Sequence, residues 1–130
     1  MTPPARLATA LRHQAQGIYC LEAAAELLIA NRTWLHRTDF TAGFITLSRG
    51  LADGRQMAAV DWTAAITALT AGHLPCSGGE QRMLRLIASI ADGIPADLHD
   101  ILTGIDGHNI QLLLKAVLHA SGKRPPPPLP

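Results

Sequence analysis

The sequence predicts an all-α protein, a single compact domain of about six short helices in an orthogonal or bundle-like arrangement. Three observations favour this fold class. Apolar residues make up 48% of the 130-residue chain, many of them alanine, while aromatic residues make up only 4%. Runs of β-branched residues are short, whereas strands favour such residues. The apolar residues recur every three or four positions, which is the period of an amphipathic helix.

The clearest predicted helix begins after Ser77 and ends at Gly93. Ser77 and Glu80 have the Ser-x-x-Glu spacing of a capping box, in which each side chain bonds to the backbone N–H of the other residue. Gly93 can end the helix because glycine readily adopts a positive φ. Between them lies a wide apolar stripe made of Met83, Leu84, Leu86, Ile87, Ile90 and Ala91. We expect this helix to be central to the core.

The other elements are expected in order along residues 5–122, after a short lead over 1–4. A first helical pattern follows Pro4, and Gly17 weakens its continuation. A second covers 18–30, with Asn31 as a left-handed cap. Asp61 caps a helix that ends at Gly72. Pro95 marks the start of a short helix that runs to residue 103. Asp106 caps the last helix, whose apolar stripe covers 110–118, and an extended proline-rich tail occupies 123–130.

Residues 38–60 allow two interpretations. Thr38 or Asp39 can cap a third helix, with Phe40, Phe44 and Leu47 facing inward at helical spacing. Alternatively, residues 44–47 form a short strand that pairs with 57–60, and the glycine-rich stretch 49–55 is the hairpin loop. We favour the helix and keep the hairpin as the alternative.

Charge and cysteine content limit the compartment and the partners. Eleven basic and ten acidic residues give a formal net charge of +1, so no overall field favours nucleic acid or an anionic membrane. Cys20 and Cys76 lie far apart in the sequence, which is typical of a reduced cytosolic protein. No apolar signal core and no membrane-length apolar run is present. We expect a cytoplasmic protein that does not bind membranes.

One short string resembles a phosphate-binding motif. Residues 76–82, Cys-Ser-Gly-Gly-Glu-Gln-Arg, resemble the signature loop of ABC-type ATPases. The Gly-x-x-x-x-Gly-Lys loop and the apolar strands of that machinery are missing, so we interpret the string mainly as a capped helix. If the chain binds an anion, we expect it at Ser77, Gly78, Gly79 and Arg82, where backbone N–H groups meet the helix dipole.

We expect no catalytic residue, no metal site and no cofactor, and therefore a protein that is not an enzyme. Asp97, His99 and Asp100 lie close in sequence, but on a helix His99 points away from the two carboxylates. Cys76 precedes a helix N-terminus, a position that can lower the pKa of a thiol. Neither feature is accompanied by the converging groups that catalysis needs.

Four arginine residues indicate DNA binding as an alternative function. Arg32 and Arg37 lie around Trp34, and Arg82 and Arg85 lie one turn apart on the capped helix. Small helical domains often place such a helix in the major groove of DNA. The four arginines are therefore the candidate nucleic-acid contacts.

Four runs carry a family resemblance: residues 22–30 (Glu-Ala-Ala-Ala-Glu-Leu-Leu-Ile-Ala), Asp61-Trp62, residues 74–80 (Leu-Pro-Cys-Ser-Gly-Gly-Glu) and residues 103–106 (Thr-Gly-Ile-Asp). Over residues 18–122 the chain resembles a group of small uncharacterised all-helical proteins of actinobacterial type. The resemblance implies a bacterial cytosolic protein with one domain, and it brings no activity to transfer.

The leading functional expectation is a non-enzymatic protein–protein interaction module that binds itself, as a homodimer, or another protein. The motivating features are the apolar stripes at 83–91 and 110–118, which are broad for a small domain to cover. The alternative is a DNA-associated accessory or regulatory protein.

The tail contains an Arg-x-x-Pro-x-x-Pro spacing at 124–130, which aromatic-lined domains bind, although we interpret it as a solvated terminus.

Overall fold

Seven α-helices, one 3-10 turn and one two-stranded sheet form the described part of the chain, residues 2–123 of a computed structural model. The elements are α1 (Pro4–Ala15), α2 (Tyr19–Asn31), the 3-10 turn η1 (Trp34–His36), α3 (Thr38–Phe44), β1 (Ile45–Arg49), β2 (Gln56–Val60), α4 (Trp62–Thr70), α5 (Gly78–Asp92), α6 (Leu98–Gly104) and α7 (Gly107–Ala120). The predicted helical character is confirmed, with a small sheet added to it. The tail at 124–130 lies outside the described residues.

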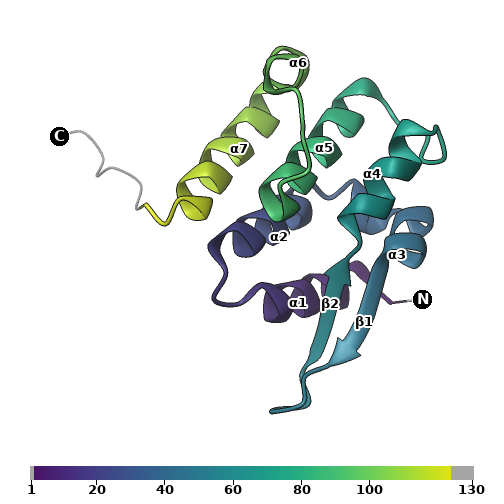
Figure 1. Ribbon diagram of the computed structural model, residues 1–130, viewed down its shortest axis with the longest axis vertical. Helices are drawn as coiled ribbons and strands as arrows, with labels where there is room; N and C mark the ends of the chain where they lie inside the picture. Colours follow the sequence, from purple (N-terminus) through teal and green to yellow (C-terminus); the bar gives the residue numbers. More distant parts are fainter. Residues whose placement is uncertain (1, 124–130) are drawn as a thin grey trace.

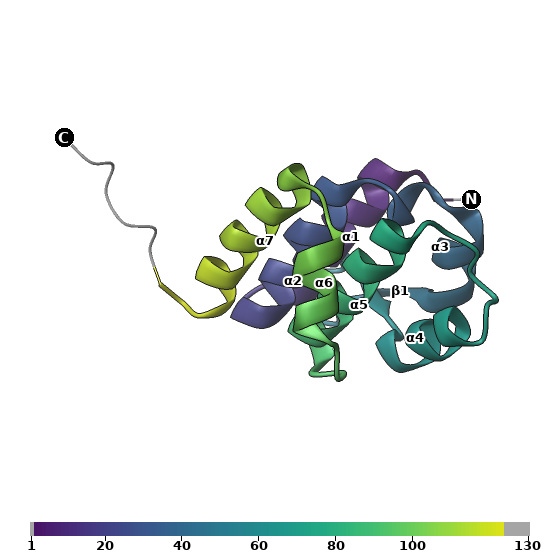
Figure 2. The ribbon, with the colours of Figure 1, turned by 90° about the horizontal axis from the view of Figure 1, so that it is seen from above.

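Helices α2 and α5 form the centre of the molecule (Figure 1). Helix α7 packs along α2, α1 packs on α2 and on β2, and α4 packs on α5. The short α6 packs on α5, and the view from above shows it in front of α2 and α5 at the centre of the molecule (Figure 2). None of these helices combines the length and apolar character needed to cross a membrane, within the residues described.

The apolar stripe of α5 is the middle of the core. Met83, Leu84, Ile87 and Ala88 are fully buried. The capping box is present as predicted: Glu80 N–H donates to Ser77 Oγ (3.2 Å) and Ser77 N–H donates to the Glu80 carboxylate (2.9 Å). Because this stripe is covered by the rest of the domain, it is not available to a partner.

Other predicted helix boundaries are confirmed or corrected by their caps. Asp61 and Asp106 accept backbone N–H bonds at the starts of α4 and α7, as expected. Asp97, rather than Pro95, begins α6, because its carboxylate accepts the N–H of Asp100 (3.2 Å). Arg32, rather than Asn31, has the left-handed backbone that ends α2, with φ 67°.

The first three helices can be compared with the expectations in the same way. Pro4 is the first residue of α1, which agrees with its expected place in the first turn of a helix. Gly17, with φ 90°, separates α1 from α2. Neither Thr38 nor Asp39 is the cap of α3; the helix follows Arg37, which makes no side-chain cap bond.

The favoured helical reading of residues 44–60 is wrong, and the alternative hairpin is observed. Helix α3 ends at Phe44, and Ile45 pairs with Val60 at the start of an antiparallel ladder. Asp61 N–H donates to Phe44 C=O (2.8 Å), so the backbone at the base of the hairpin continues the ladder instead of the helix. Ala58, in the middle of β2, is buried against α1, a long-range contact that helical spacing cannot reveal.

Candidate functional site

The N-terminus of α5 brings the predicted anion-binding residues together, but they are used to fold the protein. Ser77 is engaged in the capping box, which also places the Glu80 carboxylate at this helix end. A carboxylate there already satisfies the positive end of the helix dipole and repels a second anion. The geometry therefore favours a structural role for Ser77, Gly78 and Gly79.

Arg82 joins α5 to α6. Its Nε lies 3.1 Å and its Nη2 3.3 Å from the two carboxylate oxygens of Asp100, which is a bidentate pair. Its side chain passes so close to Gly104 that a Cβ there would lie 2.3 Å from the Arg82 Nε. Glycine at position 104 therefore leaves room for the arginine, and the Asp100 carboxylate balances the charge that an anion would need.

Arg37 is the centre of a second structural contact. Its guanidinium stacks on the Trp34 ring at 4.7 Å, makes two hydrogen bonds to Asp39 (3.0 and 2.5 Å) and donates to the Pro75 carbonyl (2.7 Å). Trp34 Nε1 also donates to the Glu80 carbonyl (3.2 Å). We call Trp34, Arg37 and Asp39 the Arg37 clasp. It fixes the segment that leads into α5 against η1.

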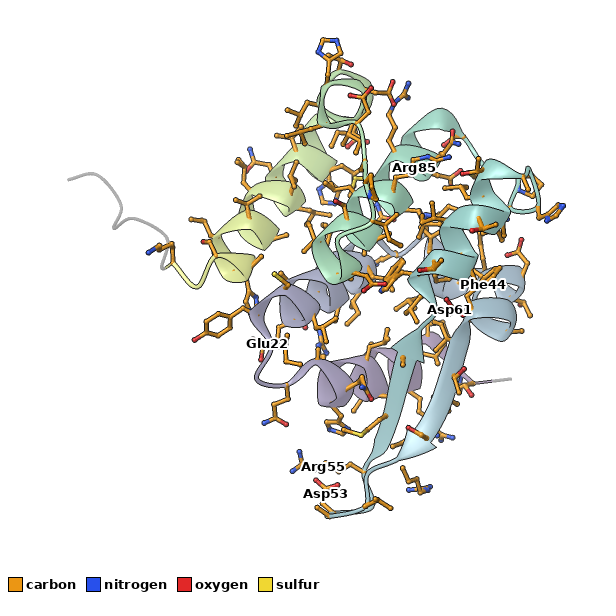
Figure 3. The ribbon with its side chains drawn as sticks, viewed as in Figure 1. Glu22, Phe44, Asp53, Arg55, Asp61 and Arg85 are labelled. Atoms are coloured by element: carbon orange, nitrogen blue, oxygen red, sulfur yellow. The ribbon has the colours of Figure 1, made fainter. Side chains whose placement is uncertain are left out.

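The four candidate DNA-contacting arginines do not share one role. Arg37 belongs to the clasp and Arg82 pairs with Asp100. Arg85 donates to the Thr70 hydroxyl (3.1 Å) and so ties α5 to α4, near the end of α4 in Figure 3. Arg32 is exposed, and within residues 2–123 its side chain has no hydrogen bond or ion pair. Three of the four guanidinium groups thus have intramolecular partners.

The Cys76 thiol does not have the activated character that its position suggested. Burial raises the pKa of the Cys76 thiol, and the Glu80 carboxylate raises it further. A position before a helix N-terminus can lower the pKa of a thiol, but here desolvation and the neighbouring negative charge raise it. Within the described residues, no group of three or more His, Cys, Asp or Glu side chains is placed to hold a metal ion.

A cavity of about 200 Å³ lies between α1, α2 and β2. Its lining is mainly alanine, leucine and valine, with Trp62 at one wall. Its polar side chains are Gln14 and the Asp92 carboxylate. The lining therefore offers apolar volume, and the polar groups that it contains do not include a nucleophile beside a base.

Exposed apolar side chains lie on α6 and, separately, on α7. Leu98 and Leu102 are four residues apart and share one side of α6, and Leu114 and Val117 share one side of α7. Their exposed fractions are 55%, 46%, 55% and 52%, respectively. We call these four residues the α6–α7 surface. Leucine and valine at helical spacing in solvent are unlike the isolated exposed apolar residues of an ordinary surface.

The neighbouring side of α7 is the one that packs on α2, and this packing leaves Leu114 and Val117 uncovered. Leu113 and Ala116 are buried against α2. His119 Nε2 lies 2.9 Å from the Glu22 carboxylate, and Asn31 Nδ2 donates to Asn109 Oδ1 (3.0 Å), so polar contacts fix both ends of this packing. Because these contacts set the rotation of α7, the side chains of Leu114 and Val117 face solvent.

No family model, curated protein or solved structure matches this chain.

Sequence reasoning identified the capping box but not the contacts made by its neighbours. The partners of Arg37 and Arg82 are Pro75 and Asp100, which come from other elements. One signal was present for α6: Asp97 and Asp100 have the spacing of an N-cap and its third helical residue. That assignment starts the helix at Leu98 and places Leu98 and Leu102 on one exposed side.

Proposed function

We propose that this protein is a non-enzymatic interaction module that binds a protein partner through the α6–α7 surface. The observation that carries the proposal is the exposure of Leu98 and Leu102 on α6 and of Leu114 and Val117 on α7, the next helix in the chain. The partner is expected to present an apolar stripe, such as one side of an amphipathic helix, because the four side chains offer no charge for recognition.

The exposed apolar area can form the centre of a contact but does not by itself give measurable affinity. Full burial of one leucine or valine contributes about 1.5–3 kcal/mol, so covering the exposed half of one side chain contributes roughly 1 kcal/mol. Four such side chains contribute about 4 kcal/mol in all. Association itself costs at least about 4 kcal/mol, so the partner must add contacts around this centre for micromolar affinity.

The hydrogen bonds of the arginine side chains favour the interaction module over the DNA-associated alternative. Arg37, Arg82 and Arg85 have hydrogen-bond partners within the domain. Phosphate binding would require these hydrogen bonds to break, and their loss would reduce the free energy of binding. The affinity for duplex DNA, measured by titration at low salt, should therefore be weak and equal for the wild type and for Arg82→Ala. Salt-dependent binding that falls in Arg82→Ala would favour the DNA alternative.

Both cysteines are free, and Cys20 is exposed. An exposed thiol persists in a reducing compartment, which supports our placement of the protein in the cytoplasm. We expect both thiols to be reduced when the protein is recovered from whole cells under thiol-trapping conditions.

Site-specific photo-crosslinking in the producing cells tests the proposed surface. A photoreactive amino acid at Leu114 should give an adduct with one defined protein, and the added substitution Leu102→Glu should abolish that adduct. The same amino acid at Thr63, exposed on α4, is the control and should give none. Absence of an adduct at Leu114, or an adduct that is unaffected by Leu102→Glu, would contradict the proposal.

A further inference from the structure

The two edges of the hairpin differ in how they are covered. On the β2 side, α1 packs along the strand, and His13 Nδ1 lies 3.1 Å from the Gln56 carbonyl oxygen. β1 is the other edge of the sheet; α1 passes behind the hairpin in Figure 1, and its Leu7 lines a hollow together with Ile45 and Leu47 of β1. The side chains of β1 from Thr46 to Arg49 are exposed. An uncovered strand edge is a template for another strand.

The register identifies which backbone groups of β1 are free. Asp61 N–H donates to Phe44 C=O at the base of the hairpin, and Gly50 N–H donates to Arg55 C=O near its tip. Figure 3 shows Phe44 and Asp61 at the base and Asp53 and Arg55 at the tip. Hydrogen-bonded pairs alternate along an antiparallel ladder, so the even-numbered residues of β1 bond to β2.

The odd-numbered residues of β1 therefore direct their backbone groups toward the open edge. Ile45 N–H is used by α3, since it donates to Thr41 C=O. The remaining groups are the C=O of Ile45 and both the N–H and C=O of Leu47 and Arg49. Within residues 2–123 these groups have no hydrogen-bond partner.

We propose that β1 pairs with β1 of a second copy of this chain, antiparallel and centred on Leu47. This register places all the residues of β1 opposite residues of the partner's β1. Leu47 N–H then donates to the C=O of Leu47 of the partner subunit, and Arg49 N–H donates to the C=O of the partner's Ile45, with the reciprocal bonds formed by symmetry. Thr46 comes opposite the partner's Ser48, a favourable cross-strand pair.

The hairpin tip and the base of β1 support the same register. Leu51 at the tip is fully exposed, with a relative exposure of 106%, and has no core to fill in its own chain. In the antiparallel pairing, the hairpin tip that carries Leu51 of the partner subunit lies toward the end of α3. A hollow of about 270 Å³ lies between α3, β1 and the start of the chain, and its lining residues are Thr2, Leu7, Thr38, Thr41, Ala42, Ile45 and Leu47. The leucine of one copy thus reaches the hollow of the other.

Analytical ultracentrifugation of the full chain over a wide concentration range tests the pairing. We expect a reversible monomer–dimer equilibrium. Leu47→Pro removes an N–H that does not bond to β2, so it should leave the hairpin ladder intact and raise the dimer Kd by at least about 30-fold, since two modest hydrogen bonds are lost per dimer. Leu47→Ala keeps the N–H and isolates the side-chain contribution. Circular dichroism of each variant checks that it is folded.

Two further measurements keep the proposal falsifiable if the proline variant unfolds. The amides of Leu47 and Arg49 in the wild type should become more protected from hydrogen exchange as protein concentration rises. Leu51→Glu, at a fully exposed position, should weaken the dimer, whereas Leu114→Glu on α7 should not. A strict monomer, or a dimer that is lost in Leu114→Glu and kept in Leu47→Pro and Leu51→Glu, would overturn the proposal without affecting the partner surface on α6 and α7.

Discussion

Replacing Arg37 with lysine separates a structural role of this arginine from a DNA-binding role. Lysine keeps the positive charge that a phosphate contact needs. It lacks the planar fork with which Arg37 bonds to Asp39 and Pro75 while it stacks on Trp34. Arg37→Lys should therefore destabilise the fold while it leaves the net charge unchanged.

The magnitude follows from the geometry of the clasp. The ion pair is worth only about 0.5 kcal/mol because the Asp39 side chain is 45% exposed and screened by solvent. The charged bond to the Pro75 carbonyl contributes about 1.5 kcal/mol, and the stack on Trp34 adds about 0.5 kcal/mol. Lysine retains part of the ion pair, so the expected loss is about 2 kcal/mol. With an unfolding entropy of about 2.1 cal/mol/K for each of 130 residues, Tm falls by about 7 °C.

Urea denaturation and thermal melting measure this loss directly. Arg32→Lys is the matched control, because Arg32 is exposed and its side chain has no partner within residues 2–123. The control should differ from the wild type by less than about 0.5 kcal/mol. Equal stabilities for Arg37→Lys and Arg32→Lys would refute the account of the clasp.

Three further predictions concern the caps, the charges and the core. Ser77→Ala should destabilise the protein by about 1 kcal/mol in urea denaturation through loss of the α5 N-cap, and an unchanged midpoint would contradict this. Hydrogen bonds from Arg37 hold the pKa of the Asp39 carboxyl below its ordinary value of 3.8. Its stabilisation is therefore complete above that value and is lost as pH falls through the lower folded pKa. The stability difference between the wild type and Asp39→Asn should shrink toward about pH 2; a constant difference would contradict the linkage. Ile87→Ala in the centre of α5 should cost about 2–5 kcal/mol, whereas Leu114→Ala on the exposed side of α7 should cost less than about 1 kcal/mol; similar losses would show that α7 is buried after all.

Local signals predicted much of the fold. The starts of α4, α5 and α7 could be predicted because Asp61, Ser77 and Asp106 bond to backbone only three residues away. The hairpin was left as an alternative, because Phe40, Phe44 and Leu47 also fit a helix. What decides between the two is burial of β2 against α1, and that packing joins segments more than forty residues apart.

The candidate site was less predictable than the fold, for a related reason. The sequence shows that an arginine is charged but not which residue it binds. Arg37 and Arg82 bind residues of other elements. Likewise, the stripes of α5 and α7 look equally apolar. Only the packing shows that α5 is enclosed on its apolar side, while Leu114 and Val117 lie beyond the contact of α7 with α2.

The most direct test of the proposed function is the affinity of the protein that is crosslinked at Leu114, measured by titration against purified variants. Leu114→Glu would place an unpaired charge in the apolar contact, so we predict a rise in Kd of about 30-fold or more. Leu51→Glu, the same substitution at the hairpin tip, should leave the affinity unchanged. Equal affinities for the wild type and Leu114→Glu would contradict the α6–α7 surface as the binding site.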